Sequence, residues 1–240
     1  MKVSVAIGTG LNIRMAQRPR ALLAWSSGKD SAWTLHCLRQ ADEVEVVGLL
    51  TTFNMQFDRV AMHAVRRTLV EYQAQRAGLR LFDVPIPWPC SNEQYEQAMR
   101  SFLETAIAEL DISHVAFGDL FLEDIRKYRE ERMAQTGLTP LFPIWGEPTR
   151  ELAQKMVAAG LRAKITCVDP AKLPAEFAGR TFDQEFLNDL PDGIDPCGEN
   201  GEFHSYTYAG PMFSADIPVT VGEVVERDGF VFADVLPESV

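Results

Sequence analysis

The sequence predicts an α/β protein built on a doubly wound parallel sheet, with a smaller C-terminal α+β lobe. Short, uninterrupted apolar runs alternate with helical patterns over the first half of the chain, as in strands that are buried on both faces. After Asp119 the pattern changes to shorter helices and strands separated by Pro and Gly. With 240 residues, 46% of them hydrophobic and 24% charged, the chain has the composition of an ordinary globular protein.

The elements of the predicted sheet follow one another in strict alternation. The expected strands are 21–25, 44–50, 81–86 and 114–117. The expected helices between them are 30–40, 59–78 and 92–110, the second closed by Gly78 as its C-terminal cap. Strands separated by helices favour a parallel sheet covered on both faces.

The remaining segments complete the predicted organisation. Residues 1–20 have no clear period, and we expect a disordered leader, with Met15 as an alternative start. The first lobe is then expected at 21–135. The C-terminal lobe, 136–240, shows helical patterns at 122–136 and 149–159, the first of them crossing the boundary, a strand at 163–168 and a β-like segment at 220–235.

Charge and apolar content exclude several classes of protein. The formal charge of -11 gives an acidic surface, so duplex DNA or tRNA is an unlikely partner. No apolar run reaches the roughly 18 to 20 residues of a membrane span, and no signal peptide is recognisable, so a cytoplasmic location is expected. The four cysteines form no C-x-x-C pair and read as free thiols: Cys37, Cys90, Cys167 and Cys197.

The segment between the first strand and the first helix carries the strongest chemical signal. Residues 25–31 read W-S-S-G-K-D-S, and the positive end of a helix with exposed backbone N–H groups favours an anion there. Gly28 permits close approach of a phosphate, and Lys29 supplies a positive charge. Ser26 and Ser31 add hydroxyl groups.

The residues of this loop allow two other interpretations to be tested against known patterns. A Walker A loop would need glycine at position 23, which is Leu23, and Ser or Thr in place of Asp30, so that interpretation fails. An ordinary turn with a helix N-cap stays open on spacing alone, because Ser and Asp cap helices without any ligand.

Four segments resemble one known family in sequence and in order. The loop 26–31 is similar to the S-G-G-x-D-S loop of N-type ATP pyrophosphatases. Residues 117–124, F-G-D-L-F-L-E-D, resemble the F-G-D-I-x-L-x-D segment of the diphthine-ammonia ligase branch of that superfamily. Residues 140–146 resemble its L-x-P-L-W-G stretch, and residues 195–204 its C-G-E-x-G-E-[YF] signature.

The resemblance implies a fold, a reaction and cofactors. It implies an adenine nucleotide alpha hydrolase-like fold and an AMP-forming amide ligase, in which ATP activates a carboxyl or carbonyl group, pyrophosphate leaves, and ammonia or an amine attacks. ATP and Mg²⁺ are the expected cofactors, and a small molecule or a protein side chain is the expected acceptor. A homodimer is left open.

Roles for single residues follow from the same resemblance. Lys29 and Asp119 are the expected catalytic residues, and Asp30 and Asp119 the expected Mg²⁺ ligands, with a helix cap as the alternative for Asp30. The nucleotide is expected to contact the loop and the ends of two strands, at Ser26, Ser27, Gly28, Lys29, Asp30, Ser31, Thr51, Thr52, Phe53 and Gly118. Arg126 and Arg129 read either as phosphate ligands or as surface cations.

The polar segment near the C-terminus is expected to bind the acceptor. Its candidates are Cys197, Gly198, Glu199, Asn200, Gly201, Glu202 and His204, and the two glutamates could receive an amine or ammonium. A Cys197 nucleophile paired with His204 is an alternative. His63 reads as a structural histidine.

This chain departs from the eukaryotic and archaeal pattern of the family at three places. They are Ser27, Asn200 and the pair 203–204. We therefore expect a bacterial-type member and leave the acceptor open. The competing functions are a tRNA-modifying ATP pyrophosphatase, which usually needs a cysteine pair and a basic face, and an ATP-binding regulator without turnover.

Overall fold

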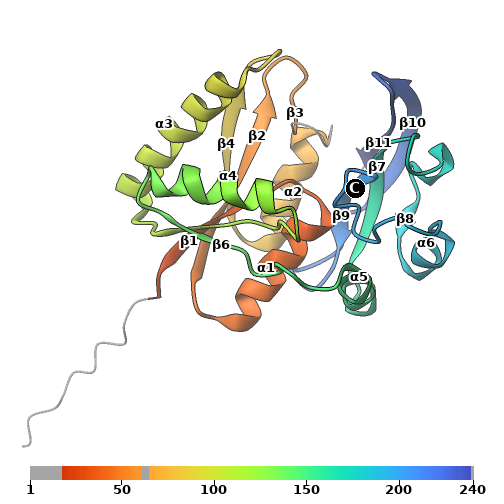
Figure 1. Ribbon diagram of the computed structural model, residues 1–240, viewed down its shortest axis with the longest axis horizontal. Helices are drawn as coiled ribbons and strands as arrows, with labels where there is room; N and C mark the ends of the chain where they lie inside the picture. The colour runs from red at the N-terminus through yellow and green to blue at the C-terminus, as the bar shows by residue number, and fades with distance from the viewer. Residues whose placement is uncertain (1–17, 61–64, 239–240) are drawn as a thin grey trace, which may run out of the picture.

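The computed structural model describes residues 18–60 and 65–238 (Figure 1). The predicted disordered leader therefore lies outside the described residues, except for its last three positions. Of these, Arg20 already begins the first strand. His63, predicted to be structural, also lies outside the described residues.

The first lobe is built on a parallel sheet in the order β4-β2-β1-β5-β6. A two-residue strand, β3, pairs antiparallel with the end of β2. The strands are β1 (Arg20–Ala24), β2 (Glu45–Asn54), β3 (Arg59–Val60), β4 (Arg80–Ile86), β5 (His114–Ala116) and β6 (Thr139–Leu141). The order runs outward from β1 in both directions, which confirms the doubly wound α/β class.

Helices cover both faces of this sheet. They are α1 (Lys29–Ala41), α2 (Arg67–Ala77), α3 (Asn92–Leu110) and α4 (Glu123–Ala134). Leu35 of α1 and Leu69 of α2 belong to one buried cluster, whereas Leu103 of α3 and Met133 of α4 belong to another. Side chains of β1 contribute to both clusters, as expected for a strand buried on both faces.

Three details of the predicted first lobe are wrong. The helix expected at 59–78 begins only at Arg67, because β3 pairs with the end of β2 after a turn in which the Asn54 side chain accepts two backbone N–H groups. Residues 51–54 continue β2 instead of following it. The segment β6 pairs with β5, so residues beyond 135 still belong to the first sheet.

The second lobe is an antiparallel sheet in the order β10-β11-β7-β8, with β9 also paired to β7. Its elements are α5 (Thr149–Ala158), β7 (Arg162–Val168), η1 (Ala175–Phe177), β8 (Thr181–Phe182), α6 (Gln184–Asp189), β9 (Phe203–Ala209), β10 (Val219–Arg227) and β11 (Phe230–Pro237). The predicted β-like segment at 220–235 is the hairpin of the last two strands.

The two lobes share one hydrophobic core. Leu35 and Leu69 of the first lobe cluster with Ile165 and Tyr206 of the second, and all four side chains are fully buried. In Figure 1 the second sheet lies beside α1 and α2, at the end of the first sheet where β1 leads into α1. Among the described residues, no helix is both long and apolar enough to cross a membrane.

Candidate functional site

The predicted phosphate loop connects the end of β1 to the first turn of α1. Ser27 adopts a left-handed backbone conformation (φ 71°), and Gly28 is the N-cap of the helix. The loop after β5 packs tightly against it, because a Cβ on Gly118 would lie 3.1 Å from backbone atoms of Asp30 and Ser31. Only glycine fits there without displacing the start of α1.

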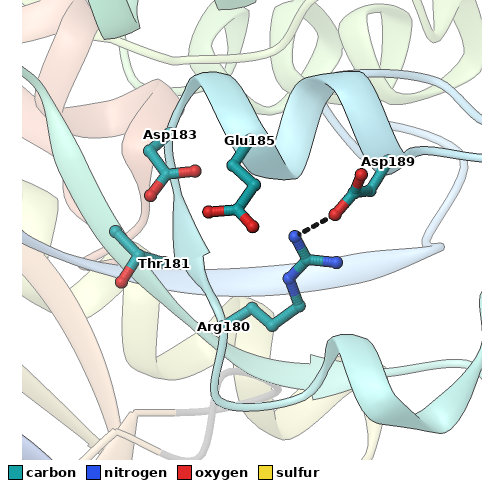
Figure 2. A pocket seen from close by; sticks show the side chains of 5 residues that line it. All are labelled: Arg180, Thr181, Asp183, Glu185 and Asp189. Atoms are coloured by element: carbon teal, nitrogen blue, oxygen red, sulfur yellow. Dashed lines mark hydrogen bonds and ion pairs between the residues drawn. The ribbon is translucent and has the colours of Figure 1, made fainter.

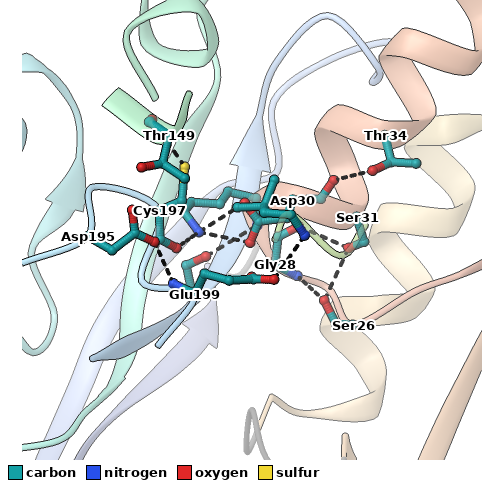
Figure 3. Close-up of polar contacts among 12 residues, drawn as sticks. Ser26, Gly28, Asp30, Ser31, Thr34, Thr149, Asp195, Cys197 and Glu199 are labelled. Atoms are coloured by element: carbon teal, nitrogen blue, oxygen red, sulfur yellow. Dashed lines mark hydrogen bonds and ion pairs between the residues drawn. The ribbon is translucent and has the colours of Figure 1, made fainter. Parts of the chain in front are cut away.

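Hydroxyl groups hold this loop from within, as Figure 3 shows. The Ser26 Oγ accepts the N–H of Gly28 at 3.3 Å and lies 3.2 Å from the Ser31 Oγ, which donates to the Gly28 carbonyl. The N–H groups of the first helical turn have no intrahelical acceptors. That of Lys29 donates to the Ser205 Oγ, and those of Asp30 and Ser31 make a favourable environment for an anion.

The loop faces a cavity of about 1240 Å³. The carboxyl ends of β1, β2 and β5 form its floor, α3 and α4 form one side, and the C-terminal lobe forms the other. Of the residues expected to bind nucleotide or acceptor, those lining it are Ser26, Gly28, Lys29, Asp30, Ser31, Thr52, Gly118, Asp119, Cys197, Gly198, Glu199, Gly201 and His204. Ligand pockets are usually smaller, about 300 to 1000 Å³, so this one has room for two substrates.

Three predicted nucleotide contacts, Ser27, Thr51 and Phe53, do not line the cavity. The prediction is wrong for Ser27 because its side chain is fully buried. Successive side chains of β2 point to opposite faces of the sheet, so Thr52 lines the cavity while its neighbours Thr51 and Phe53 do not. The Thr51 hydroxyl donates to the Trp25 carbonyl at 2.8 Å, and Phe53 is fully buried in the core. Asn54, which the sequence reading did not select, lines the cavity instead.

Lys29 is held by a fixed set of partners. Its ammonium donates to the Asp30 carboxylate at 2.8 Å and to the carbonyl of Cys197 in the C-terminal lobe. Burial alone would lower the pKa of Lys29, but the negative charges around it, that of Asp30 first, and the hydrogen bond to Asp30 together hold the pKa above its usual value. The side chain is 3% exposed. The structure therefore places this cation between the two lobes, beside the loop.

The two carboxylates expected to bind Mg²⁺ differ in their surroundings. Burial raises the pKa of Asp30, and both of its oxygens already accept hydrogen bonds from Lys29. The Asp119 Oδ2 forms an ion pair with the Arg129 Nε (3.5 Å), but this buried oxygen accepts no hydrogen bond among the described residues. No group of three or more acidic, His or Cys side chains in the described part of the chain is arranged to hold a metal.

The segment 197–204, the acceptor segment, is expected to bind the acceptor and is divided between the cavity and the interior. Glu199 lines the cavity, and its Oε1 accepts the N–H of Leu120 at 2.9 Å. Burial, with some opposition from that hydrogen bond, raises the pKa of Glu199 to about 7. Glu202 and Asn200 do not line the cavity. Glu202 is buried and accepts the N–H of Asp195 and the Asn200 amide, so it organises the segment from inside.

Cys197 does not have the environment of a nucleophile. Burial raises the pKa of its thiol well above the usual range, and the Sγ donates to the Thr149 carbonyl at 3.5 Å. Burial and the charge of Lys29 lower the pKa of His204 to about 4. A protonated thiol is a poor nucleophile, so the geometry gives the alternative of a cysteine nucleophile no support.

Several residues that build the site were missed in the sequence. Ser205 of β9 caps α1 by accepting the N–H of Lys29 at 3.2 Å, and Asp195 accepts the N–H of Glu199 at 2.8 Å. Gln73 of α2 bonds to the loop at Ser27. No local sequence pattern predicts these hydrogen bonds. Ser205 and Gln73 bond to residues far away along the chain, and Asp195 bonds within an irregular loop. Of the two arginines left open, Arg129 lines the cavity, and Arg126 lies over Phe142 instead.

A second hollow lies on the C-terminal lobe (Figure 2). It is lined by Arg180, Thr181, Asp183, Glu185 and Asp189. Arg180 and Asp189 neutralise each other at 2.6 Å, and Asp183 caps α6. Its charged groups are thus largely engaged in holding the helix, and the large cavity is the better candidate site.

The parallel sheet with its loop between β1 and α1 defines an α/β protein of the adenine nucleotide alpha hydrolase-like class. Sequence comparison narrows this class. The diphthamide synthase N-terminal domain matches residues 19–140, and the diphthamide synthase C-terminal domain matches residues 148–233. The chain therefore belongs to the diphthamide synthase family, both of whose domains it carries.

Individual relatives are distant, but each match covers most of this chain. The diphthine-ammonia ligase of Bos taurus is 25% identical over 232 residues, which cover 88% of this chain and 86% of that protein. The diphthine-ammonia ligase of Homo sapiens gives the same values. That of Schizosaccharomyces pombe is 24% identical over 219 residues, which cover 84% of this chain but 36% of the yeast protein.

Proposed function

We propose that this protein is an ATP-dependent ligase that adenylates a carboxyl or carbonyl acceptor, releases pyrophosphate and forms an amide with ammonia or an amine. One observation carries the proposal: the loop 26–31 and the acceptor segment 197–204 line the same cavity. An adenylating ligase needs its nucleotide and its acceptor side by side, because the α-phosphate must reach the acceptor oxygen.

The loop offers what the terminal phosphates of ATP need. The hydroxyls of Ser26 and Ser31 and the first-turn N–H groups would bind the phosphates that depart as pyrophosphate. The ammonium group of Lys29 adds a positive potential at the loop. This potential would stabilise the negative charge that develops on the leaving pyrophosphate.

Asp119 is the residue that would hold Mg²⁺. Its buried Oδ2 forms an ion pair with the Arg129 Nε (3.5 Å) but accepts no hydrogen bond among the described residues, and a hard cation prefers carboxylate oxygens. Asp30 fits less well because Lys29 engages both of its oxygens. A bound Mg²⁺ would neutralise phosphate charge during transfer.

The diagnostic experiment follows the phosphates. The protein is incubated with ATP, Mg²⁺, ammonium and candidate carboxylates, and we expect AMP and pyrophosphate in equal amounts. Exchange of labelled pyrophosphate into ATP should require the acceptor but not ammonium, because adenylation precedes attack by the amine. Release of ADP and phosphate would contradict the proposal.

The same assay separates the competing functions. A regulator that binds ATP without turnover would yield neither product with any acceptor, although ATP would still protect it from thermal unfolding. A tRNA-modifying enzyme would require tRNA for exchange. The formal net charge of -11 and the absence of a C-x-x-C pair in the sequence favour the ligase over that alternative.

A further inference from the structure

Gln73 is a fully buried amide at the point where the two lobes meet the phosphate loop. It projects from α2, which contributes no residue to the cavity lining. Buried amides are costly unless their hydrogen-bonding groups are satisfied. Its partners therefore explain why a polar residue occupies this position in the core.

The amide of Gln73 joins three segments. Its Oε1 accepts the indole N–H of Trp25 at 2.8 Å, at the end of β1. Its Nε2 donates to the carbonyl of Ser27 at 2.9 Å and to the carbonyl of Thr207, in β9, at 2.6 Å. The indole can only donate, so it fixes which end of the amide is the oxygen. Both N–H groups then necessarily face the two carbonyls.

The carbonyl of Ser27 is also bonded from the C-terminal lobe. The N–H of Thr207 donates to it at 2.9 Å, so two donors converge on one oxygen. Ser27 has a left-handed backbone (φ 71°), a conformation that is unfavourable for a residue with a Cβ. The hydrogen bonds to its carbonyl oppose a return to a relaxed conformation.

We infer that Gln73 is a positioning residue that, together with β9, holds Ser27 in its left-handed conformation and thereby keeps the loop 26–31 in the shape that binds phosphates. The inference rests on the proposed binding of ATP at this loop. It implies that the C-terminal lobe shapes the nucleotide site through β9, since this strand, which continues from the acceptor segment, also fixes the loop.

The test compares Gln73→Met with a matched control. Methionine keeps the length of the side chain but removes all three hydrogen bonds. Tyr206→Phe removes another fully buried hydrogen bond between β9 and α2, from the Tyr206 hydroxyl to the Leu69 carbonyl (3.0 Å), which does not touch the loop. Both variants are expected to be less stable, but only Gln73→Met should weaken binding of a non-hydrolysable ATP analogue, by about tenfold, a change of about 1.4 kcal/mol.

Rescue makes the test specific for the backbone of Ser27. Glycine adopts positive φ without strain, so adding Ser27→Gly to Gln73→Met should restore most of the lost affinity. A merely structural role for Gln73 would not respond to this second change. If Gln73→Met does not fold, Gln73→Glu, which keeps the acceptor for Trp25 but loses donors to both carbonyls, is measured in the same way.

The outcomes separate this inference from the proposed function. If the unmodified protein does not bind the analogue, the proposed function fails. If it binds, and Gln73→Met or Gln73→Glu binds equally well, the positioning role is wrong. Weak binding that Ser27→Gly does not rescue, or an equal loss of affinity in Tyr206→Phe, would also overturn it.

Discussion

Glu199 of the acceptor segment accepts a 2.9 Å hydrogen bond from the backbone N–H of Leu120, which directly follows Asp119. This contact joins the C-terminal lobe to the carboxyl end of β5. The contact therefore fixes Glu199 and Asp119 relative to each other. Glu199 is proposed to receive the amine, and Asp119 is proposed to hold Mg²⁺.

Glu199 should make stability depend on pH. Burial raises its pKa from 4.5 to about 7, and the charges facing it are those of Asp30, Lys29 and Asp119. Between these pH values the folded protein binds the proton more tightly than the unfolded chain, so the free energy of unfolding should fall as pH rises from about 4.5 to about 7.

The variant Glu199→Gln tests this directly. The amide oxygen of the new side chain can still accept the Leu120 N–H, but this side chain does not titrate. The free energy of unfolding should therefore fall less over that pH range than in the unmodified protein. Above pH 7 the variant should be the more stable of the two. Urea unfolding at several pH values measures this, with Glu104→Gln on the exposed face of α3 as control. An unchanged pH dependence in Glu199→Gln would refute the assignment.

Removing the Lys29 ammonium should affect both stability and turnover. Lys29→Ala leaves the Asp30 carboxylate largely buried without its partner, which should cost about 3 kcal/mol of unfolding free energy. Turnover of the folded enzyme should fall by a factor on the order of 10² to 10³. Lys155→Ala, which breaks an exposed pair with Glu147, should have a much smaller effect on both. Equal effects of the two variants would contradict the role given to Lys29.

Gly118→Ala should disturb the phosphate loop because the added methyl group would press against the backbone at the start of α1. The new methyl group would lie 3.1 Å from backbone atoms at the start of α1, so we expect a loss of about 1 to 3 kcal/mol in stability and weaker ATP binding. In Gly222→Ala the nearest atom is the end of the Leu236 side chain, which can move. The control should bind ATP normally, as judged by calorimetry. Normal ATP affinity in Gly118→Ala would show that the packing is looser than described.

Thiol labelling should distinguish the cysteines. Cys167 and Cys197 are buried, and burial raises the pKa of both thiols, to about 11 for Cys167. A disulfide reagent at pH 7.5 should therefore label Cys37 and Cys90 in the folded protein and reach the other two only after denaturation. Mass spectrometry identifies the labelled sites. Rapid labelling of Cys197 in the folded protein would reopen the case for a cysteine nucleophile.

Local patterns in the sequence carried enough information for most of the first lobe. The helix predicted at 92–110 has those bounds in the structure, because Ser91 and Gln94 form a capping box that marks its start. The loop after β1 was predicted correctly as a strand-to-helix connection, since an apolar run leads directly into a Ser/Gly cluster.

Contacts between distant residues could not be predicted in the same way. The β3 strand exists only through its pairing with β2, and Val60 in isolation fits the helical pattern equally well. Ser205 is 176 residues from Lys29, and Gln73 is 134 residues from Thr207. Which face of β2 meets the cavity was also open, so Thr51 and Phe53 were selected together with Thr52.

The central claim is that the loop between β1 and α1 binds the terminal phosphates of ATP, beside the segment that receives the acceptor. A crystal structure with a non-hydrolysable ATP analogue tests it most directly. We predict phosphate oxygens within hydrogen-bonding distance of the Ser26 and Ser31 hydroxyls, with the α-phosphate on the side of Glu199. An analogue bound elsewhere, with this loop left empty, would contradict the account.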